Sequence, residues 1–492
     1  MDFTYNLLPS RLRVEMMRDP DERLIVRHYL THTVHIITAF ESPTQPWNPW
    51  LSVHIPLAFI HPPNTSHAAD ALRIAILAVG AVHLRYVNDP TDQESAWKIT
   101  RSAKSKVLKL VQQTLENRDG TPKDVDSGEI ELVLAALLSC TIANSLAADD
   151  SWHELLNTVI SLIERVGGAP HLLQDSPRDH MSPCRFFCEQ LAIRDVFGCM
   201  STEMAPRILK DAFTPWFFEA EGWSRGDDEW ESVERMFGMS RGMVDIIARS
   251  CSLISQVCHT NYHIYEHQDA SYSPLDCVTP TTNPSASFHL RLPERIAARL
   301  SVPTYEPSSL RSTAEYPAPL AEHLDPDLDP EHESERAELE DTANDLMAEL
   351  KIWDQASNFT PIHPRTQYGD HCYRLATRIR LLRNVFRVSS TDHRVISAAD
   401  AIMELAKEML AQYGRIVWLT WPILVAGFHI PKDDPARRAA LEMLGAFGPH
   451  ACFDNTAASR MLAEYWEFHD RDEEDLPPSR VIQRLNSRPF LD

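Results

Sequence analysis

The feature that most constrains this fold is an uncharged, strongly apolar run from Ile416 to Phe428 in a chain that is otherwise acidic. Such a run has to be buried, and at about 13 residues it is too short to cross a bilayer. Pro422 fits the first turn of a helix, where its missing N–H is not needed. Gly427 then either ends the helix or lets a neighbouring backbone approach. We therefore expect a buried helix around Trp421 and Pro422, followed by two further helices over residues 436–447 and 455–468.

Composition points to helices throughout. The chain has 492 residues, 43% of them hydrophobic, with only 15 glycines but 34 prolines. This balance suits helices separated by Pro-bearing breaks, and no alternating pattern is strong enough to indicate a strand. We predict an all-α fold, a large antiparallel assembly of many helices with one long Pro-rich, acidic loop.

A shift in composition divides the chain into three parts. Residues 1–265 are expected to form the N-terminal helical part. Residues 266–330 are rich in Pro, Ser, Thr and Asp, which predicts a mobile linker. Residues 331–492 are expected to form a C-terminal helical part that packs back on the first.

Net charge and cysteine spacing limit the functions that this chain can have. A formal charge of −23 argues against direct binding to nucleic acid, which needs a basic surface. The nine cysteines are scattered and none is part of a Cys-x2-Cys pair, which favours reduced thiols inside a cell. Two helices are basic, and we interpret both as solvated faces, with an acidic partner or an anion as the alternative. Their side chains are Lys98, Arg101, Lys104, Lys106 and Lys109 in one helix, and Arg374, Arg378, Arg380, Arg383 and Arg387 in the other.

Five blocks of the sequence, in order, resemble the regulatory domain of fungal-specific transcription factors of the zinc binuclear cluster family. Together the blocks run from Tyr29 to Trp466, and Trp421-Pro422 to Gly427 is the strongest of them. The structural motif residues that carry the resemblance are Trp152, His153, Gly167, Gly168, Trp421, Pro422, Ala426, Gly427 and Trp466. Further matching positions are Tyr29 to His32, Ala71 to Leu84, Gly238 with Ser240 and Arg241, and Tyr373 to Phe386.

The resemblance implies a nuclear, non-enzymatic domain that regulates RNA polymerase II transcription by binding an effector or a partner. It implies partners in the transcription machinery or among related factors, a small-molecule effector, and a homodimer as one further expectation. The family reads DNA through its zinc cluster, whose paired Cys-x2-Cys spacings do not occur in this sequence. We therefore expect no cofactor in this chain, zinc only if a cluster lies upstream, and DNA contact only through that cluster or a partner. A protein without zinc fingers that titrates related factors is the second interpretation.

Ser240 provides an alternative from another class. Gly238-Met239-Ser240-Arg241-Gly242 matches G-x-S-x-G, the nucleophile elbow of serine hydrolases. That elbow needs a strand before the serine, whereas residues 229–237 are acidic and helix-like. We therefore interpret Gly238 and Ser240 as the start of a helix and predict no catalytic residue.

Three sets of residues have metal-ligand types, and each has a structural explanation. His28 and His32 lie one helical turn apart but have no third ligand. His180, Cys184 and Cys188 also share a face, without an identifiable fourth ligand. Asp325 to Asp329 begins like a calcium loop, but Pro330 and Arg336 occupy positions that need Gly and Glu. We predict no metal site.

Overall fold

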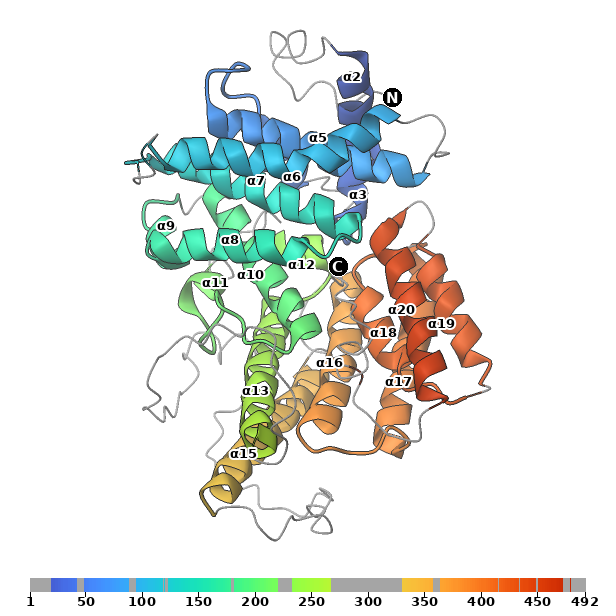
Figure 1. The fold of residues 1–492 in the computed structure, drawn as a ribbon. Coiled ribbons are helices and arrows are strands. Elements are labelled where there is room, and N and C mark those ends of the chain that lie inside the picture. Colours follow the sequence, from blue (N-terminus) through green and yellow to red (C-terminus); the bar gives the residue numbers. More distant parts are fainter. Residues whose placement is uncertain are drawn as a thin grey trace.

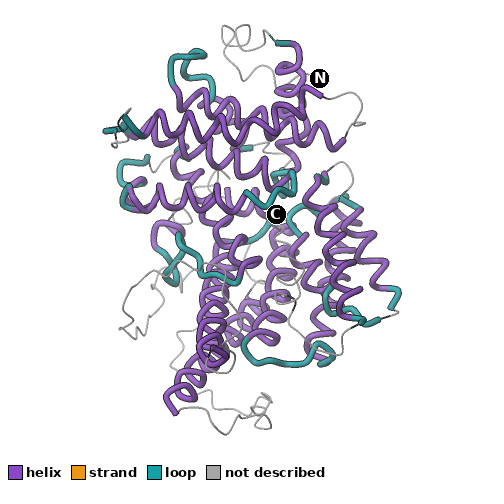
Figure 2. Tube along the Cα trace, viewed as in Figure 1, coloured by secondary structure: helices purple, strands orange, loops and turns teal. Residues whose placement is uncertain are grey.

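Helices form the whole architecture that the computed structural model describes, and no strand occurs among its described residues. These are residues 19–41, 48–87, 94–117, 119, 123–177, 181–219, 232–266, 330–356, 363–414, 416–432, 434–447, 450–471 and 478. Figure 2 shows helices joined by loops throughout. The predicted all-α class is therefore confirmed. The predicted linker, residues 266–330, lies almost entirely outside the described residues.

The N-terminal part stacks its helices in successive layers, with α5, α6 and α7 above α8 and α10 in the view of Figure 1. In chain order its elements are α2 (Pro20–His28), η2 (Tyr29–Thr33), α3 (Val34–Ile36), η3 (Trp50–His54), α4 (Ile55–Leu57), α5 (His67–Val87), α6 (Glu94–Leu115), α7 (Ser127–Leu146), α8 (Trp152–Arg165), α9 (Gly168–Leu172), α10 (Pro183–Thr202), α11 (Pro215–Glu219), α12 (Ser232–Phe237) and α13 (Arg241–Glu266).

The C-terminal part begins with α15, which runs antiparallel to α13, and ends in the group α17 to α20 (Figure 1). Its elements are α15 (Pro330–Ala356), α16 (Pro364–Asn384), α17 (His393–Tyr413), α18 (Thr420–Gly427), α19 (Ala436–Gly445) and α20 (Phe453–His469). Arg249 donates two hydrogen bonds to Glu349, at 2.7 and 2.6 Å, and so joins α13 to α15. One core of buried apolar side chains includes residues from both parts of the chain.

The central helices α5 and α7 are apolar on almost every side. Both have the length and composition of a membrane span, yet 83% of each apolar window is buried inside the protein. Neighbouring helices cover them, so their composition is explained by a position in the core. The apolar run over residues 132–148 predicts a buried helix, and α7 occupies most of this run.

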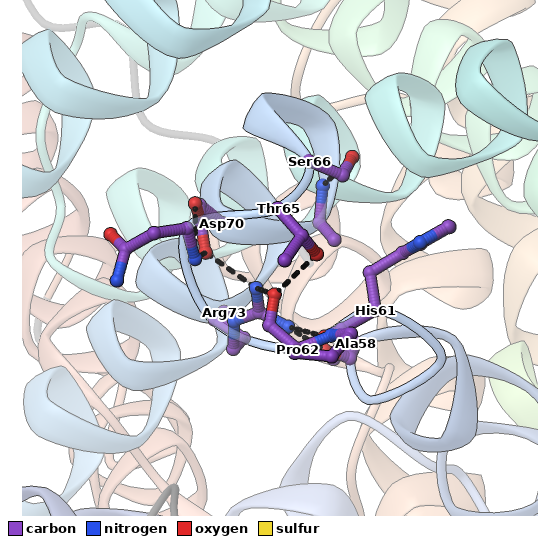
Figure 3. A network of polar contacts seen from close by, with 9 residues as sticks. Ala58, His61, Pro62, Thr65, Ser66, Asp70 and Arg73 are labelled. Carbon is purple, nitrogen blue, oxygen red and sulfur yellow. Dashed lines mark hydrogen bonds and ion pairs between the residues drawn. The ribbon is translucent and has the colours of Figure 1, made fainter.

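The start of α5 is held by a network that Figure 3 shows from close by. Arg73 donates to the carbonyl oxygens of Ala58 at 2.6 Å and His61 at 2.8 Å, and its other amino group pairs with Asp70. Ser66 accepts a hydrogen bond from the N–H of Ala69 at 3.3 Å and so caps the first turn. These contacts join the loop after α4 to α5 and fix where the core helix begins.

The first helix differs from the sequence prediction in its backbone. Apolar residues from Leu24 to Phe40 at helical spacing predict one regular helix over residues 21–40, but Tyr29–Thr33 forms a π-helical turn between α2 and α3. The sequence also predicts a short helix over residues 50–60, before Pro62 and Pro63, and a second π-helical turn, Trp50–His54, lies within that range. The two turns meet at the hydroxyl of Tyr29, 3.5 Å from Nδ1 of His54. A π-helical turn adds one residue to a helical turn and shifts side chains around the axis, which no apolar periodicity predicts.

Candidate functional site

The apolar run forms α18 and the turn before it, and Gly427, the last residue of α18, contacts α20. A Cβ added to Gly427 would lie 2.8 Å from a methyl carbon of Leu462, so a larger residue here would force this side chain to move. The indole N–H of Trp466 donates to the carbonyl oxygen of Gly427 at 2.8 Å. The guanidinium of Arg437 lies 5.0 Å from the centre of the Trp466 ring. Gly427 and Trp466, which are 39 positions apart, therefore form one helix–helix contact.

Trp421, near the start of α18, contacts α16. Its ring is 3% exposed and lies nearly parallel to the ring of Tyr373, with 5.7 Å between the centres. The guanidinium of Arg380 lies 5.8 Å from the same tryptophan ring. Pro422 and Ala426 are buried as well. This part of the motif packs α18 against α16.

The remaining motif residues lie in α8 and at the turn into α9, and Trp152 of α8 contacts α10. Trp152 is fully buried, and a Cβ on Gly198 would meet its ring at 3.2 Å. The ring of His153 lies edge-on to that of Trp152, 5.5 Å away. Gly167 and Gly168 follow with φ of 97° and 83°, values that favour glycine, and they turn the chain into α9. The nine motif residues thus lie in two regions of the fold, one where α18 contacts α16 and α20, and one where α8 contacts α10 and turns into α9.

A cluster of buried polar residues joins both parts of the chain at the start of α13. Arg365 of α16 is 1% exposed and donates to the carbonyl oxygens of Gly238, at 3.3 Å, and Val417. A Cβ on Gly369 would lie only 1.7 Å from the carbonyl oxygen of Gly238, so the two backbones touch. We call Gly238, Ser240, Arg365, Gly369 and Asp370, with the turn at residues 416–419, the α13 junction.

Asp370 caps α13 across this junction. Its carboxylate accepts a hydrogen bond from the N–H of Ser240 at 2.8 Å, and the Ser240 hydroxyl accepts from the N–H of Met243 at 3.3 Å. Burial raises the pKa of Asp370 to about 7, although the contacts with Ser240 and Trp353 and the charge of Arg365 act to lower it. The indole of Trp353 from α15 also packs on Gly242, where a Cβ would approach it to 2.3 Å. Three helices thus meet at one carboxyl group.

A buried ion pair lies directly after the junction. Arg241 of α13 contacts Glu189 of α10 at 2.9 Å, and both side chains are fully buried. The hydroxyl of Ser232 donates to the same carboxylate, and Arg241 donates to the carbonyl oxygen of Phe217 at 2.9 Å. Removing one partner of such a pair leaves a buried charge, so the pair strongly constrains how α10 and α13 pack.

The turn before α18 contains a strained backbone. Trp418 has a φ of 67°, which is rare for a bulky side chain. Its carbonyl oxygen accepts from the hydroxyl of Tyr373 at 2.9 Å, and its ring lies 4.6 Å from that of Phe237 and 5.8 Å from that of Phe197. The guanidinium of Arg194 lies 5.5 Å from the same ring. Contacts from α10, α12 and α16 together hold this conformation.

Ser240 does not have the surroundings of a nucleophile elbow. The segment before it, Ser232–Phe237, is helix α12, so the strand that the elbow needs is replaced by a helix. The Ser240 hydroxyl receives the N–H of Met243, as in a helix N-cap, and the residue is 8% exposed. The structure therefore supports the interpretation of Gly238 and Ser240 as a helix start.

His28 and His32 join a small group of rings between α2 and α5. Nε2 of His28 lies 3.1 Å from Nδ1 of His83, and the rings of His28 and His32 are 5.0 Å apart. Burial lowers the pKa of His28 to about 4, so this ring is neutral near pH 7. Nowhere in the described ranges do three or more His, Cys, Asp or Glu side chains gather as a metal site would need.

The other metal candidates lie partly outside the described residues. His180 and Asp325 to Asp329 are not described. Cys184 and Cys188 are buried in α10, and the thiol of Cys184 donates to the carbonyl oxygen of Leu172 at 3.5 Å. The neighbouring Cys184 and burial raise the pKa of the Cys188 thiol, which keeps it protonated.

The two basic helices differ in where their charges lie. On α6, Lys106 and Lys109 are exposed, and Lys104 pairs with Glu154 of α8 at 2.8 Å. On α16, Arg380 is partly buried, lying 3.5 Å from the sulfur of Cys251, and Arg383 donates to the carbonyl oxygen of Val388 at 2.6 Å. The interpretation as solvated faces therefore suits α6 better than α16.

Sequence reasoning did not single out Arg365, Asp370 or Glu189, the charged side chains of the junction and its buried ion pair. A signal was present for Glu189, because α10 places charged residues among apolar residues on every side of the helix. Arg365 and Asp370 lie five residues apart in a polar stretch, and their burial follows only from the contact with Gly238.

Comparison with known proteins gives one family. The family model of the fungal specific transcription factor domain matches residues 23–479, a range that runs from within α2 to beyond α20. Searches of curated proteins and of solved structures gave no significant match.

Proposed function

This chain belongs to the fungal specific transcription factor domain family, and we propose that it is an effector- or partner-binding module controlling RNA polymerase II transcription in the nucleus. A regulatory role in transcription follows from the family, whose members generally act in the nucleus. We propose further that the molecule it binds is part of the transcription machinery, a related factor or a small molecule. We also propose that the DNA is bound by a zinc cluster or by a partner and not by this chain itself.

The α13 junction is the element through which a bound effector would change the packing of the domain. The observation that carries this proposal is the set of buried contacts from Arg365, whose guanidinium binds carbonyl oxygens of Gly238 and Val417 at once. Three chain segments, far apart in the sequence, are thereby held by one side chain. A ligand that favours a different position of any segment has to break the same contacts, which makes the response of the domain concerted.

Buried charge makes alternative packings of this junction few and distinct. Glu189 and Arg241 are fully buried, so α10 and α13 cannot slide gradually without separating a charge pair. Asp370 and Gly369 allow little displacement of the α13 start, because each lies in direct contact with its backbone. Structures of this kind move between discrete arrangements, which is what a regulatory domain needs.

The role is tested by attaching the chain to an unrelated DNA-binding module in a fungal cell and measuring a reporter with that module's site. The module alone is the control. We expect the fusion to change reporter transcription in one direction. Reporter output equal to that of the module alone, with the fusion present in the nucleus, would refute the regulatory role.

The serine hydrolase interpretation is tested separately. An active-serine probe should leave the purified chain unlabelled, because Ser240 caps α13. Labelling that is lost in Ser240→Ala would restore the hydrolase interpretation. The interpretation as a titrating protein predicts instead that the free chain, without a DNA-binding module, lowers the activity of a related factor.

A further inference from the structure

Helix α6 carries an exposed basic face. Residues 98–115 contain five Lys or Arg and no Asp or Glu, although the whole chain has 70 acidic residues among 492. The inward side of α6 is apolar, with Ala103, Val107 and Val111 buried. The exposed basic side chains are Lys98, Arg101, Lys106 and Lys109. They extend over about 16 Å of helix, from the helical rise of about 1.5 Å per residue.

Helix α15 carries the opposite charge on its outer face. It contains nine Asp or Glu and two Lys or Arg. Ala343, Leu346 and Leu350 are buried against α13 and α16, so the acidic side chains lie on the solvent side. The exposed acidic side chains are Glu335, Glu338, Asp341 and Asp345. They follow helical spacing along about 15 Å, a length that matches the basic face of α6.

Within the described part of the chain, neither face is neutralised at its centre. Lys106 and Lys109 have no ion pair with a described residue, and the carboxylates of Glu338, Asp341 and Asp345 have none either. Arg336 pairs with Glu340 at 3.0 Å and forms no ion pair with these three carboxylates. Figure 1 places α6 in the upper layers and α15 at the lower end of the molecule, so one copy does not bring the two faces together.

We propose that the basic face of α6 binds the acidic face of α15 in a second copy of this chain. The two faces have matching lengths and opposite charge. Every copy of this chain carries both faces, so a second copy offers the complementary surface to each. The inference does not rest on the proposed role in transcription, since it uses only the surface charges of α6 and α15.

The contact is weak and depends on salt. Each molecule carries a formal charge of −23, so the copies repel one another at long range. At about 0.15 M salt the Debye length is about 8 Å, which limits this repulsion while ion pairs at contact distance persist. Exposed ion pairs contribute little each, and two faces of three helical turns make a small interface. Association is therefore reversible and is lost at about 1 M salt.

Sedimentation equilibrium with charge-reversal variants tests the contact. One variant is Lys106→Glu with Lys109→Glu, and the other is Glu338→Lys with Asp341→Lys. At about 0.15 M salt the wild type should show an average mass above the 56.0 kDa of one chain, rising with concentration. Each variant alone should associate at least about tenfold more weakly, because like charges then face one another. An equimolar mixture of the two should regain the association, because each reversed face meets its complement.

The control is Asp400→Lys with Glu408→Lys on α17, two exposed positions that change the net charge as much as the α15 variant does. It should not weaken association, and circular dichroism should show that all variants keep their helix content. A wild type that stays at the mass of one chain overturns the proposal. So does an association that survives both reversals, or a mixture that fails to restore it.

Discussion

Replacing Asp370 with asparagine should change how the stability of the domain depends on pH. The pKa of the folded carboxyl is about 7, against an ordinary value of 3.8. The folded state therefore binds the proton more tightly than the unfolded state, and folding becomes less favourable as pH rises from about 4 to about 7. Complete ionisation costs about 4 kcal/mol, at about 1.4 kcal/mol per pH unit. Between about pH 5 and about pH 8 the cost grows by about 2–3 kcal/mol.

Asparagine keeps an oxygen that can accept the N–H of Ser240 but cannot ionise, so it removes this cost. Urea unfolding of both proteins at about pH 5 and about pH 8 measures the effect. The free energy of unfolding of Asp370→Asn, relative to that of wild type, should rise by about 2–3 kcal/mol from about pH 5 to about pH 8. The same comparison with Asp400→Asn, at an exposed position of α17, is the control for general charge effects. If the difference in free energy of unfolding between Asp370→Asn and wild type is the same at both pH values, the reasoning is refuted. A relative loss at the higher pH would show that the junction stabilises the ionised carboxylate.

Three further substitutions test the packing. Trp421→Ala should lower the free energy of unfolding by about 3–5 kcal/mol, because the ring is buried on Tyr373, and an unchanged urea midpoint would contradict this. Gly427→Ala should cost about 1–3 kcal/mol, because its Cβ would clash with a side chain of α20, whereas Gly445→Ala, which meets nothing within 4 Å, should cost nothing. Glu189→Gln should lower stability by about 3–5 kcal/mol, since it leaves a buried guanidinium without its counter-charge, and a thermal melt that matches wild type would argue against this pair as a constraint.

The helices could be predicted from the sequence because their signals are local. A cap at Thr65 or Ser66 and the uncharged stretch over residues 74–82 predict a helix that runs to residue 86, and α5 ends at Val87. The helix expected over 436–447 is α19, Ala436–Gly445. Apolar periodicity and Pro- or Gly-bearing breaks are sufficient for elements of this kind. The π-helical turns were not predicted, because one extra residue in a helical turn leaves no pattern that distinguishes it from a regular helix.

The α13 junction could be predicted only in part. Gly238 and Ser240 were correctly interpreted as a helix start from their residue types alone. Their partners Arg365 and Asp370 are 127 and 130 positions away, and nothing local shows that these charged side chains are buried. Trp418 is a similar case, because its positive φ depends on contacts from three other helices. Long-range contacts between polar residues are set by the assembled fold, and one sequence does not encode them as a local pattern.

The decisive measurement is whether the α13 junction controls transcriptional output. The fusion to an unrelated DNA-binding module is compared with the same fusion carrying Arg365→Lys, which keeps the charge but loses the planar fork that binds two carbonyl oxygens. The matched variant is Arg249→Lys, at the ion pair between α13 and α15. Both proteins should remain helical by circular dichroism. We predict that Arg365→Lys changes reporter transcription while Arg249→Lys leaves it close to wild type. Equal reporter output from wild type and a folded Arg365→Lys protein would contradict the claim that this junction transmits the regulatory signal.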